Sequence, residues 1–181
     1  MDRRKVAGAG VRRRARLGRV QDASTEQRAL SITPEPIDGA DAAVALQCYV
    51  DELRERFPGG FDPGKAAPPA PGDFDPPRGC FLLVRDGDGR VSGCGAVRAE
   101  HGIAEIRRMW ISPALRGLGA GRRLLRELEQ RARDLGCRTV RLDTAAELNE
   151  ARGLYSSAGY AEIPAYNDNE YARHWFEKAL D

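Results

Sequence analysis

The sequence predicts one α/β domain built on a mixed, mostly antiparallel sheet of six to seven strands with helices on both faces. The chain has 181 residues, which is enough for one compact domain and short for two. Two apolar runs joined through Asp-Gly steps predict an antiparallel hairpin. Further along, a strand, a glycine-rich turn, an amphipathic helix and another strand follow one another, which is the pattern of a β-α-β unit. Hairpins followed by one such unit predict a mixed sheet.

The expected element order is β-α-loop-β-β-β-α-β-α-β-β. Pro34 and Pro36 oppose a helix, so residues 31–37 are expected to be extended. Apolar residues recur at helical spacing over residues 38–57, which predicts the first helix. Residues 58–79 contain seven of the 11 prolines and five glycines, which predicts a long loop.

The elements of the second half follow from alternation, helical periodicity and the positions of glycine and proline. Pro113 ends a strand, and Gly136 and Gly159 are natural stops for helices. A helix is the alternative for the last segment. The expected elements are strands at 80–86, 90–99 and 104–112, a helix from the glycine-rich turn through Leu135, a strand at 139–144, a helix at 147–158, and final strands at 160–163 and 171–180.

Charge is unevenly distributed along the chain. Residues 1–30 hold nine Lys/Arg and three Asp/Glu, whereas the remaining 151 residues hold 20 basic and 24 acidic residues. Residues 1–28 are therefore expected to form a basic, disordered arm and residues 29–181 the folded domain. A nucleic-acid-binding arm or a targeting segment is the alternative for the arm. The mildly acidic remainder argues against nucleic acid as a partner, because phosphates favour a basic folded surface.

Membrane, secretory and metal-binding classes find no support in the sequence. No stretch approaches the roughly 20 apolar residues of a membrane-spanning helix, and the first residues lack the apolar core of a secretory signal. The cysteines and histidines are scattered rather than clustered at ligand spacing, so we expect no metal site and a reduced, cytoplasmic chain. These residues are Cys48, Cys80, Cys94, Cys137, His101 and His174.

The most specific feature is the turn Arg116-Gly117-Leu118-Gly119-Ala120-Gly121, between a strand and a strongly amphipathic helix. Glycines at alternate positions let a ligand approach the backbone, and amides at a helix N-terminus favour an anion such as a pyrophosphate. Arg122 and Arg123 add positive charge. A dinucleotide fingerprint would need glycine where Arg122 stands, although Asp143 lies at the expected distance for one. A turn that only packs helix against strand is the remaining alternative.

Several further motifs accompany this turn. Arg116, Gly119 and Gly121 match Q/R-x-x-G-x-G/A, and residues 109–113 resemble the L-x-V-x-P strand that precedes it. In these motifs the chain resembles the GNAT superfamily, the GCN5-related N-acetyltransferases. Residues 49–63 and 163–178 resemble a bacterial stand-alone subgroup that is similar to the acetyltransferase half of MarR-type regulator fusions, so the resemblance covers about residues 30–181. The family's A-x-x-L-Y-x-x-x-G-F/Y pattern is met by Ala151, Leu154, Tyr155, Gly159 and Tyr160.

The resemblance implies an acetyl-CoA-dependent N-acetyltransferase that acetylates a primary amine by direct attack. It also implies that the third strand splays from the next one and frees backbone amides for the oxyanion. Asn149 lies one place after the asparagine position of many relatives, which Leu148 occupies. The coenzyme-binding residues that the resemblance implies are Met109, Trp110, Ile111, Arg116, Gly117, Leu118, Gly119, Ala120, Gly121, Arg122 and Asn149.

Acetyl transfer to an amine needs a base for the ammonium proton and donors for the oxyanion and the leaving thiolate. Glu105 is the expected base, directly or through a water, because the histone-acetyltransferase branch has a glutamate at the same offset in this strand. Strand alternation is expected to place four residues on one face: Glu105, Arg107, Met109 and Ile111. The resemblance implies that Tyr155 lies near the coenzyme sulfur, so Tyr155 is the expected acid that protonates the leaving thiolate. The alternative for Glu105 is a solvent-exposed strand residue with no catalytic role, and the alternative for Tyr155 is an aromatic residue that anchors its helix on the core.

The acceptor is the least defined part of the prediction, because a small amine, an amino acid, a peptide N-terminus and a protein lysine all fit the resemblance. We expect the acceptor to bind between the first helix, the proline-rich loop and residues 164–170. A non-catalytic acyl-CoA-binding module is the alternative function, and a monomer or homodimer is expected. The candidate acceptor residues are Glu52, Arg56, Tyr166, Asn167, Asn169 and His174.

Overall fold

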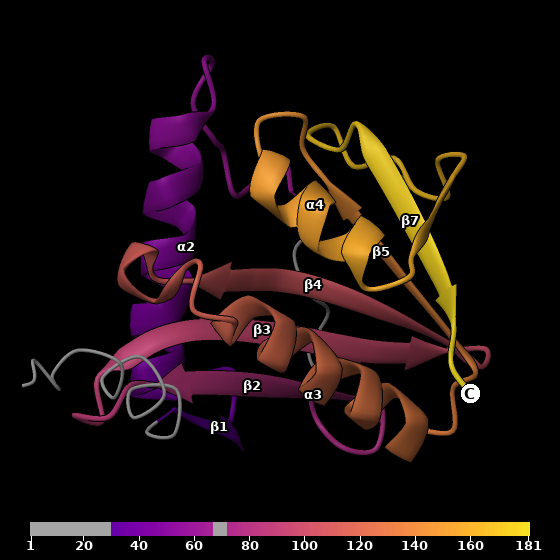
Figure 1. The fold of residues 1–181 in the computed structure, drawn as a ribbon, viewed down its shortest axis with the longest axis horizontal. Helices are drawn as coiled ribbons and strands as arrows, with labels where there is room; N and C mark the ends of the chain where they lie inside the picture. The colour runs from indigo at the N-terminus through magenta and orange to yellow at the C-terminus, as the bar shows by residue number, and fades with distance from the viewer. Residues whose placement is uncertain (1–29, 67–71) are drawn as a thin grey trace, which may run out of the picture.

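The computed structural model describes residues 30–66 and 72–181, which form one seven-stranded mixed sheet with three α-helices and a short 3-10 turn (Figure 1). The strand order across the sheet is β1-β2-β3-β4-β5-β7-β6. The strands are β1 (Ser31–Pro34), β2 (Gly79–Arg85), β3 (Val91–Glu100), β4 (Ile103–Ile111), β5 (Thr139–Thr144), β6 (Ala161–Ile163) and β7 (His174–Ala179). The helical elements are α2 (Ala40–Arg56), η1 (Pro113–Leu115), α3 (Ala120–Asp134) and α4 (Asn149–Ser157).

The predicted fold class and element order are confirmed, with shifts at several boundaries. β7 begins at His174 rather than at residue 171, because the preceding backbone turns: the Ala172 N–H donates to the Asn169 carbonyl at 3.0 Å. α4 is shorter than the predicted helix at 147–158, since Leu148 still belongs to the turn before it. The predicted disorder of residues 1–28 lies outside the described residues.

Helices cover both faces of the sheet. α2 packs on one face, called here the α2 face, over a core that includes Phe81 and Trp110. α3 and α4 lie together on the opposite face, the α3 face (Figure 1). Full burial of a leucine contributes about 1.5–3 kcal/mol, so the packing of α3 fixes its N-terminus relative to β4. The α3 residues buried in that core recur at helical spacing: Leu124, Leu125, Leu128 and Ala132.

β4 and β5 are parallel neighbours that pair over only three residues each, Ile103–Glu105 with Thr139–Arg141. Beyond these residues the two strands diverge, as Figure 1 shows. β5 pairs with β7 along its whole length instead. The expected splay is therefore present, and it opens between the C-terminal halves of β4 and β5.

A bulge in β4 changes the face that its residues occupy. Two consecutive residues of β4, beginning with Arg108, oppose the single residue Gly95 of β3, and Arg108 adopts a positive φ of 56°. Ile106, before the bulge, and Ile111, after it, both pack on the α3 face, although they are an odd number of positions apart in the sequence. The predicted alternation is therefore wrong: Glu105 and Ile111 lie on opposite faces, because the bulge adds one residue to the strand.

Candidate active site

The glycine turn joins η1 to α3. Gly117 and Gly119 have φ values of 75° and 85°, in the left-handed region, which glycine enters without the cost that a Cβ imposes. Gly119 is the N-cap of α3, and no side-chain cap hydrogen bond is made there. The N–H groups of the first helical turn lack partners within the helix. These N–H groups at the N-terminus of α3 can therefore bind an anion.

A cavity of about 310 Å³, called here the larger cavity, opens beside this turn. Parts of α2, the C-terminal end of β4, the glycine turn and α4 form its walls. The arrangement suits an extended ligand with an anionic group at the turn. Eight of the predicted coenzyme-binding residues line it: Met109, Trp110, Ile111, Arg116, Gly117, Gly119, Gly121 and Arg122.

Three predicted coenzyme-binding residues lie elsewhere. Ala120 is buried in the core of the α3 face, and Leu118 and Asn149 are not among the described residues that line the larger cavity. Asn149 is exposed, and its Oδ1 accepts a hydrogen bond from Arg152 Nη1 at 3.4 Å. Leu148 lines the cavity instead, so an apolar side chain occupies the position that the family pattern gives to asparagine.

An ion-pair network joins α2, the glycine turn and α4 along one wall of the larger cavity. Arg116 donates to Glu52, which also accepts from Trp110 Nε1 at 2.9 Å and from Arg56 Nη1 at 3.1 Å. Arg56 in turn pairs with Glu150 of α4, with Nη2 and Oε2 2.9 Å apart. Burial acts to raise the pKa of Glu52, but these hydrogen bonds hold it below its ordinary value. Glu52 and Arg56, expected on the acceptor side, thus line the larger cavity.

Tyr155 of α4 lies where the larger cavity meets a second cavity. Its buried ring packs against Tyr160 and Phe176, with ring centroids 5.9 and 5.8 Å away. Burial raises the pKa of its hydroxyl, so the phenol keeps its proton at neutral pH. No residue of the described part of the chain hydrogen-bonds to that hydroxyl. A protonated phenol at such a junction can donate a proton to a ligand.

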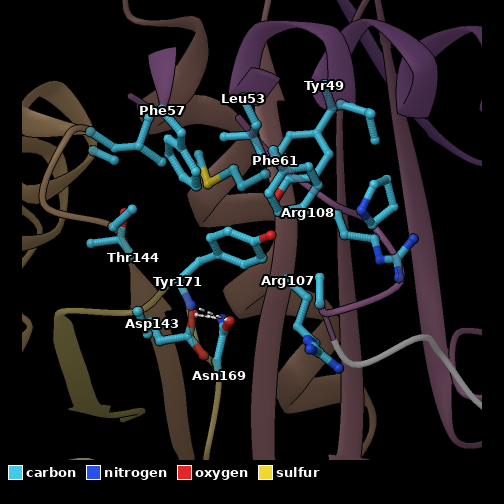
Figure 2. A pocket seen from close by; sticks show the side chains of 18 of the residues that line it. Tyr49, Leu53, Phe57, Phe61, Arg107, Arg108, Asp143, Thr144, Asn169 and Tyr171 are labelled. Atoms are coloured by element: carbon cyan, nitrogen blue, oxygen red, sulfur yellow. Dashed lines mark hydrogen bonds between the residues drawn. The ribbon is translucent and has the colours of Figure 1, made fainter. Parts of the chain in front are cut away.

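The second cavity, called here the smaller cavity, measures about 150 Å³ (Figure 2). Aromatic rings from α2 and from the two loops beside it form one wall. The rings of Phe61 and Tyr171 lie 4.8 Å apart between centroids, and those of Phe57 and Tyr171 lie 5.5 Å apart. Burial raises the pKa of Tyr49 to about 12. The two cavities share Tyr49, Leu53, Met109, Leu148, Ala151 and Tyr155.

Asp143, near the end of β5, supplies a carboxylate to the smaller cavity. Its Oδ2 accepts from Asn167 Nδ2 at 2.7 Å, and its Oδ1 accepts from Asn169 Nδ2 at 2.8 Å. Burial raises the pKa of this carboxyl, and the two amide donors oppose that shift. Figure 2 shows the bond between Asp143 and Asn169 at the edge of the cavity. Sequence reasoning did not assign Asp143 to acceptor chemistry; the available signal was its place at a strand end.

Glu105, the predicted base, is not among the described residues that line either cavity. Its Oε2 accepts from Arg98 Nε at 2.9 Å. Its Oε1 accepts from the Tyr166 hydroxyl at 3.2 Å and from Asn167 Nδ2 at 3.5 Å. Asn167 also binds Asp143, so one amide group connects the two carboxylates. Of the predicted acceptor residues in this loop, Asn169 lines the smaller cavity, whereas Tyr166 and Asn167 are not among the described residues that line it.

His174 lies at the start of β7, with its Nδ1 2.6 Å from Glu162 Oε1, and it is not among the described residues that line the two cavities. Within residues 30–66 and 72–181, no group of three or more His, Cys, Asp or Glu side chains is placed to hold a metal ion. No helix in that same part of the chain combines the length and the apolar character needed to cross a membrane.

Comparison with known proteins places the chain in a family. It matches the family model described as "Acetyltransferase (GNAT) family" over residues 46–160. It is 36% identical over 98 residues to an uncharacterized N-acetyltransferase from Schizosaccharomyces pombe, and the matched segment covers 53% of this chain and 60% of that protein. It is 38% identical over 84 residues to an IAA acetyltransferase from Azospirillum brasilense, and this match covers 45% of this chain and 54% of that protein. The chain thus spans between about half and three-fifths of the length of these relatives.

A solved structure agrees with this assignment. A protein from Klebsiella pneumoniae described as an acyl-CoA N-acyltransferase superposes with a TM-score of 0.67 and 26% sequence identity, covering 84% of this chain and 98% of that one. Its fold therefore accounts for most of the described residues. Because the family model covers more than half of the sequence, the chain belongs to the acetyltransferase (GNAT) family.

Proposed function

We propose that this chain is an acetyl-CoA-dependent N-acetyltransferase that acetylates a primary amine by direct attack. The observation that carries the proposal is the junction of the two cavities at Met109 and Tyr155. The larger cavity ends at the glycine turn, and the smaller cavity is lined by the partly buried carboxylate of Asp143. Two ligands held in this way meet in one orientation, which removes much of the entropic cost of a bimolecular reaction.

The residues of the larger cavity fit the donor. Acetyl-CoA supplies the acetyl group as a thioester. We assign the pyrophosphate to the amides of the first turn of α3 and to Arg122, whose side chain lines the larger cavity and donates to Ser157 Oγ at 2.8 Å. Arg116 adds a positive charge at the same turn, although it is paired with Glu52 in this structure. The apolar side chains of Ile111 and Leu154 line the path from the turn toward Tyr155.

Asp143 is the better placed of two candidate bases. Glu105 is held by Arg98 outside both cavities, whereas Asp143 lines the smaller one. Burial raises the pKa of the Asp143 carboxyl, which makes it a stronger base than an ordinary aspartate. We therefore assign removal of the ammonium proton to Asp143, with Glu105 acting through a water as the alternative.

Tyr155 and the backbone of β4 complete the proposed chemistry. The amine nitrogen forms a bond to the thioester carbon, and the carbon–sulfur bond breaks. The thiolate takes the phenolic proton of Tyr155. The part of β4 from Ile106 onward pairs with β3 and no longer with β5, so the splay leaves backbone N–H groups near Met109 and Ile111 for the developing oxyanion.

The glycine turn gives the first test. Calorimetric titration should show micromolar binding of acetyl-CoA, and an assay for released thiol should show turnover with amines. Gly119→Ala should weaken binding at least tenfold, because the residue adopts a positive φ at the turn. Gly136→Ala is the matched control, since Gly136 also has a positive φ but lies after the far end of α3.

The outcomes separate the alternatives. Equal losses of affinity in the two glycine variants would move the pyrophosphate away from the turn. Binding of acetyl-CoA without turnover of any amine would favour a non-catalytic acyl-CoA-binding module. The cytoplasmic location, the monomeric or homodimeric state, and the relation to the subgroup similar to MarR-type fusions stay predictions from the sequence.

A further inference from the structure

Arg108 brings an uncompensated positive charge to the smaller cavity. Its side chain lines that cavity, and burial lowers the pKa of its guanidinium below the ordinary value. Among residues 30–66 and 72–181, no carboxylate or other acceptor hydrogen-bonds to this guanidinium. Arg108 is partly buried, and arginines that lose contact with water are usually paired. The missing partner points to an anion that a ligand supplies.

The backbone at Arg108 is adapted to present this side chain. Its φ of 56° lies in the left-handed region, which is unfavourable for a residue with a Cβ. Arg108 follows Ile106 by two positions, and Ile106 packs on the α3 face. In a regular strand the side chain of Arg108 would therefore point to that same face. The bulge turns it into the smaller cavity instead. Strain of this kind is concentrated at functional sites.

The rest of the smaller cavity restricts what the ligand can be. Figure 2 shows Arg107 and Arg108 of β4 on one side of the cavity and Asp143 with Asn169 on the other. Aromatic rings such as that of Phe61 form the remaining wall. A ligand that satisfies all three parts has an anionic group, an amine and an apolar body.

We propose that the acceptor is an amino acid with an apolar side chain, and that Arg108 binds its carboxylate. The inference rests on the proposed acetyltransferase function, because the amine then lies between Asp143 and Tyr155. A guanidinium forms two parallel N–H···O bonds with a carboxylate, and this geometry suits a fixed arginine. The apolar side chain packs against the aromatic wall of Phe61 and Tyr171.

The size of the smaller cavity agrees with this class of acceptor. Its volume of about 150 Å³ is below the roughly 300–1,000 Å³ of pockets for drug-sized ligands. A lysine within a folded protein has no carboxylate on its side chain for Arg108. We therefore expect free amino acids to be better acceptors than protein lysines.

The test compares acids with their amides. L-leucine and L-phenylalanine, each beside its C-terminal amide, are titrated into the full chain saturated with coenzyme A. The amide keeps the amine and the side chain and removes only the carboxylate charge. Each acid should bind at least tenfold more tightly than its amide. It should also be acetylated with at least tenfold higher kcat/KM in the thiol-release assay.

Variants at Arg108 assign this preference to one side chain. Arg108→Asn should abolish it, and asparagine tolerates the positive φ better than most residues. Arg108→Lys keeps the charge and should retain part of the preference. Arg90→Asn, which removes an exposed arginine from the β2–β3 turn, is the matched control and should behave as the wild type. Unchanged affinity for acetyl-CoA shows that each variant is folded.

Two results would overturn the inference: equal binding of acid and amide, or a preference for the acid that survives in Arg108→Asn. Absence of binding by all four probes at millimolar concentration would overturn it as well. Turnover of amines that lack a carboxylate would leave the proposed function standing and remove only the amino-acid acceptor. Failure to bind acetyl-CoA would remove the proposed function, and titration of the four probes into the full chain without coenzyme would then measure the preference for the carboxylate by itself.

Discussion

The guanidinium of Arg116 pairs with the carboxylate of Glu52, so the arginine of the glycine turn is already engaged by α2. Arg116 also donates from Nε to the Ile111 carbonyl at 3.0 Å, which fixes the side chain against the end of β4. In the proposed donor site, a pyrophosphate at the turn would therefore meet the carboxylate of Glu52 beside Arg116. Glu52 either releases Arg116 when the donor binds or reduces the attraction of the turn for anions.

Glu52→Gln should make this competition measurable. The variant removes one negative charge from the wall of the larger cavity, so we expect acetyl-CoA to bind about three- to tenfold more tightly, on the order of one unit charge acting at a protein surface. Calorimetric titration at low and high salt should show that the gain shrinks with ionic strength. Glu55→Gln changes an exposed carboxylate of the same helix and is the control. Unchanged affinity in Glu52→Gln would show that Arg116 keeps its partner when the donor binds.

Tyr155→Phe should separate proton donation from binding. The ring and its packing against Tyr160 and Phe176 remain, so the affinity for acetyl-CoA should change little. Turnover should fall by about 10²- to 10⁴-fold, the usual contribution of a positioned proton donor. Steady-state kinetics beside calorimetric titration measures both quantities. Tyr160→Phe, a buried neighbour outside both cavities, is the control, and equal turnover in the two variants would remove Tyr155 from the acid role.

The sequence predicted best the elements whose residues carry a regular pattern of burial, which are β5 and α3. β5 has the predicted limits at residues 139–144, because buried and partly exposed residues alternate strictly along it. α3 follows from its apolar spacing and from the glycines at both of its ends. The limits of α4 and β7 moved by a few residues, since turns anchored by Leu148 and Asn169 depend on the backbone around them.

The candidate site required information that no local pattern contains. Arginine gives no local signal for a left-handed residue, so the bulge at Arg108 and the change of face after it were not predicted. Asp143 meets Asn167 and Asn169 across more than 20 residues of sequence. The pairing of Arg56 with Glu150 likewise joins two helices that are far apart in the chain. The glycine turn was recognisable because its chemistry lies within six consecutive residues.

Asp143→Asn and Glu105→Gln should distinguish the two candidate bases. We expect kcat/KM at neutral pH to fall by about 10²- to 10⁴-fold in Asp143→Asn, the range for loss of a general base. The remaining activity should rise at high pH, where more of the amine is already deprotonated. Glu105→Gln should lose less than tenfold, because its main effect is on the pairing with Arg98.

The pH profile of the wild type adds a second criterion. Burial raises the pKa of Asp143, so the activity should decline on the acidic side at a higher pH than an ordinary aspartate would give. That limb should disappear in Asp143→Asn and persist in Glu105→Gln. The reverse pattern would transfer the role of base to Glu105.

Glu150→Gln should alter the acid stability of the fold. The hydrogen bond from Arg56 lowers the pKa of Glu150 from its ordinary 4.5 to about 2. Because the folded-state pKa lies below the unfolded one, the stabilisation is fully present above pH 4.5 and is lost as the pH falls toward 2. The Glu150 side chain is 52% exposed, and such pairs contribute only about 0.2–1 kcal/mol.

Chemical denaturation of the wild type and Glu150→Gln between pH 7 and pH 2 measures this contribution. The free energies of unfolding should differ at neutral pH and converge toward pH 2, because the protonated glutamic acid no longer pairs with Arg56. Glu147→Gln is the matched control, since only the backbone carbonyl of Glu147 accepts from Arg56. A difference between wild type and Glu150→Gln that stays constant over the whole range would mean that neutral packing, and not the ion pair, joins α4 to α2.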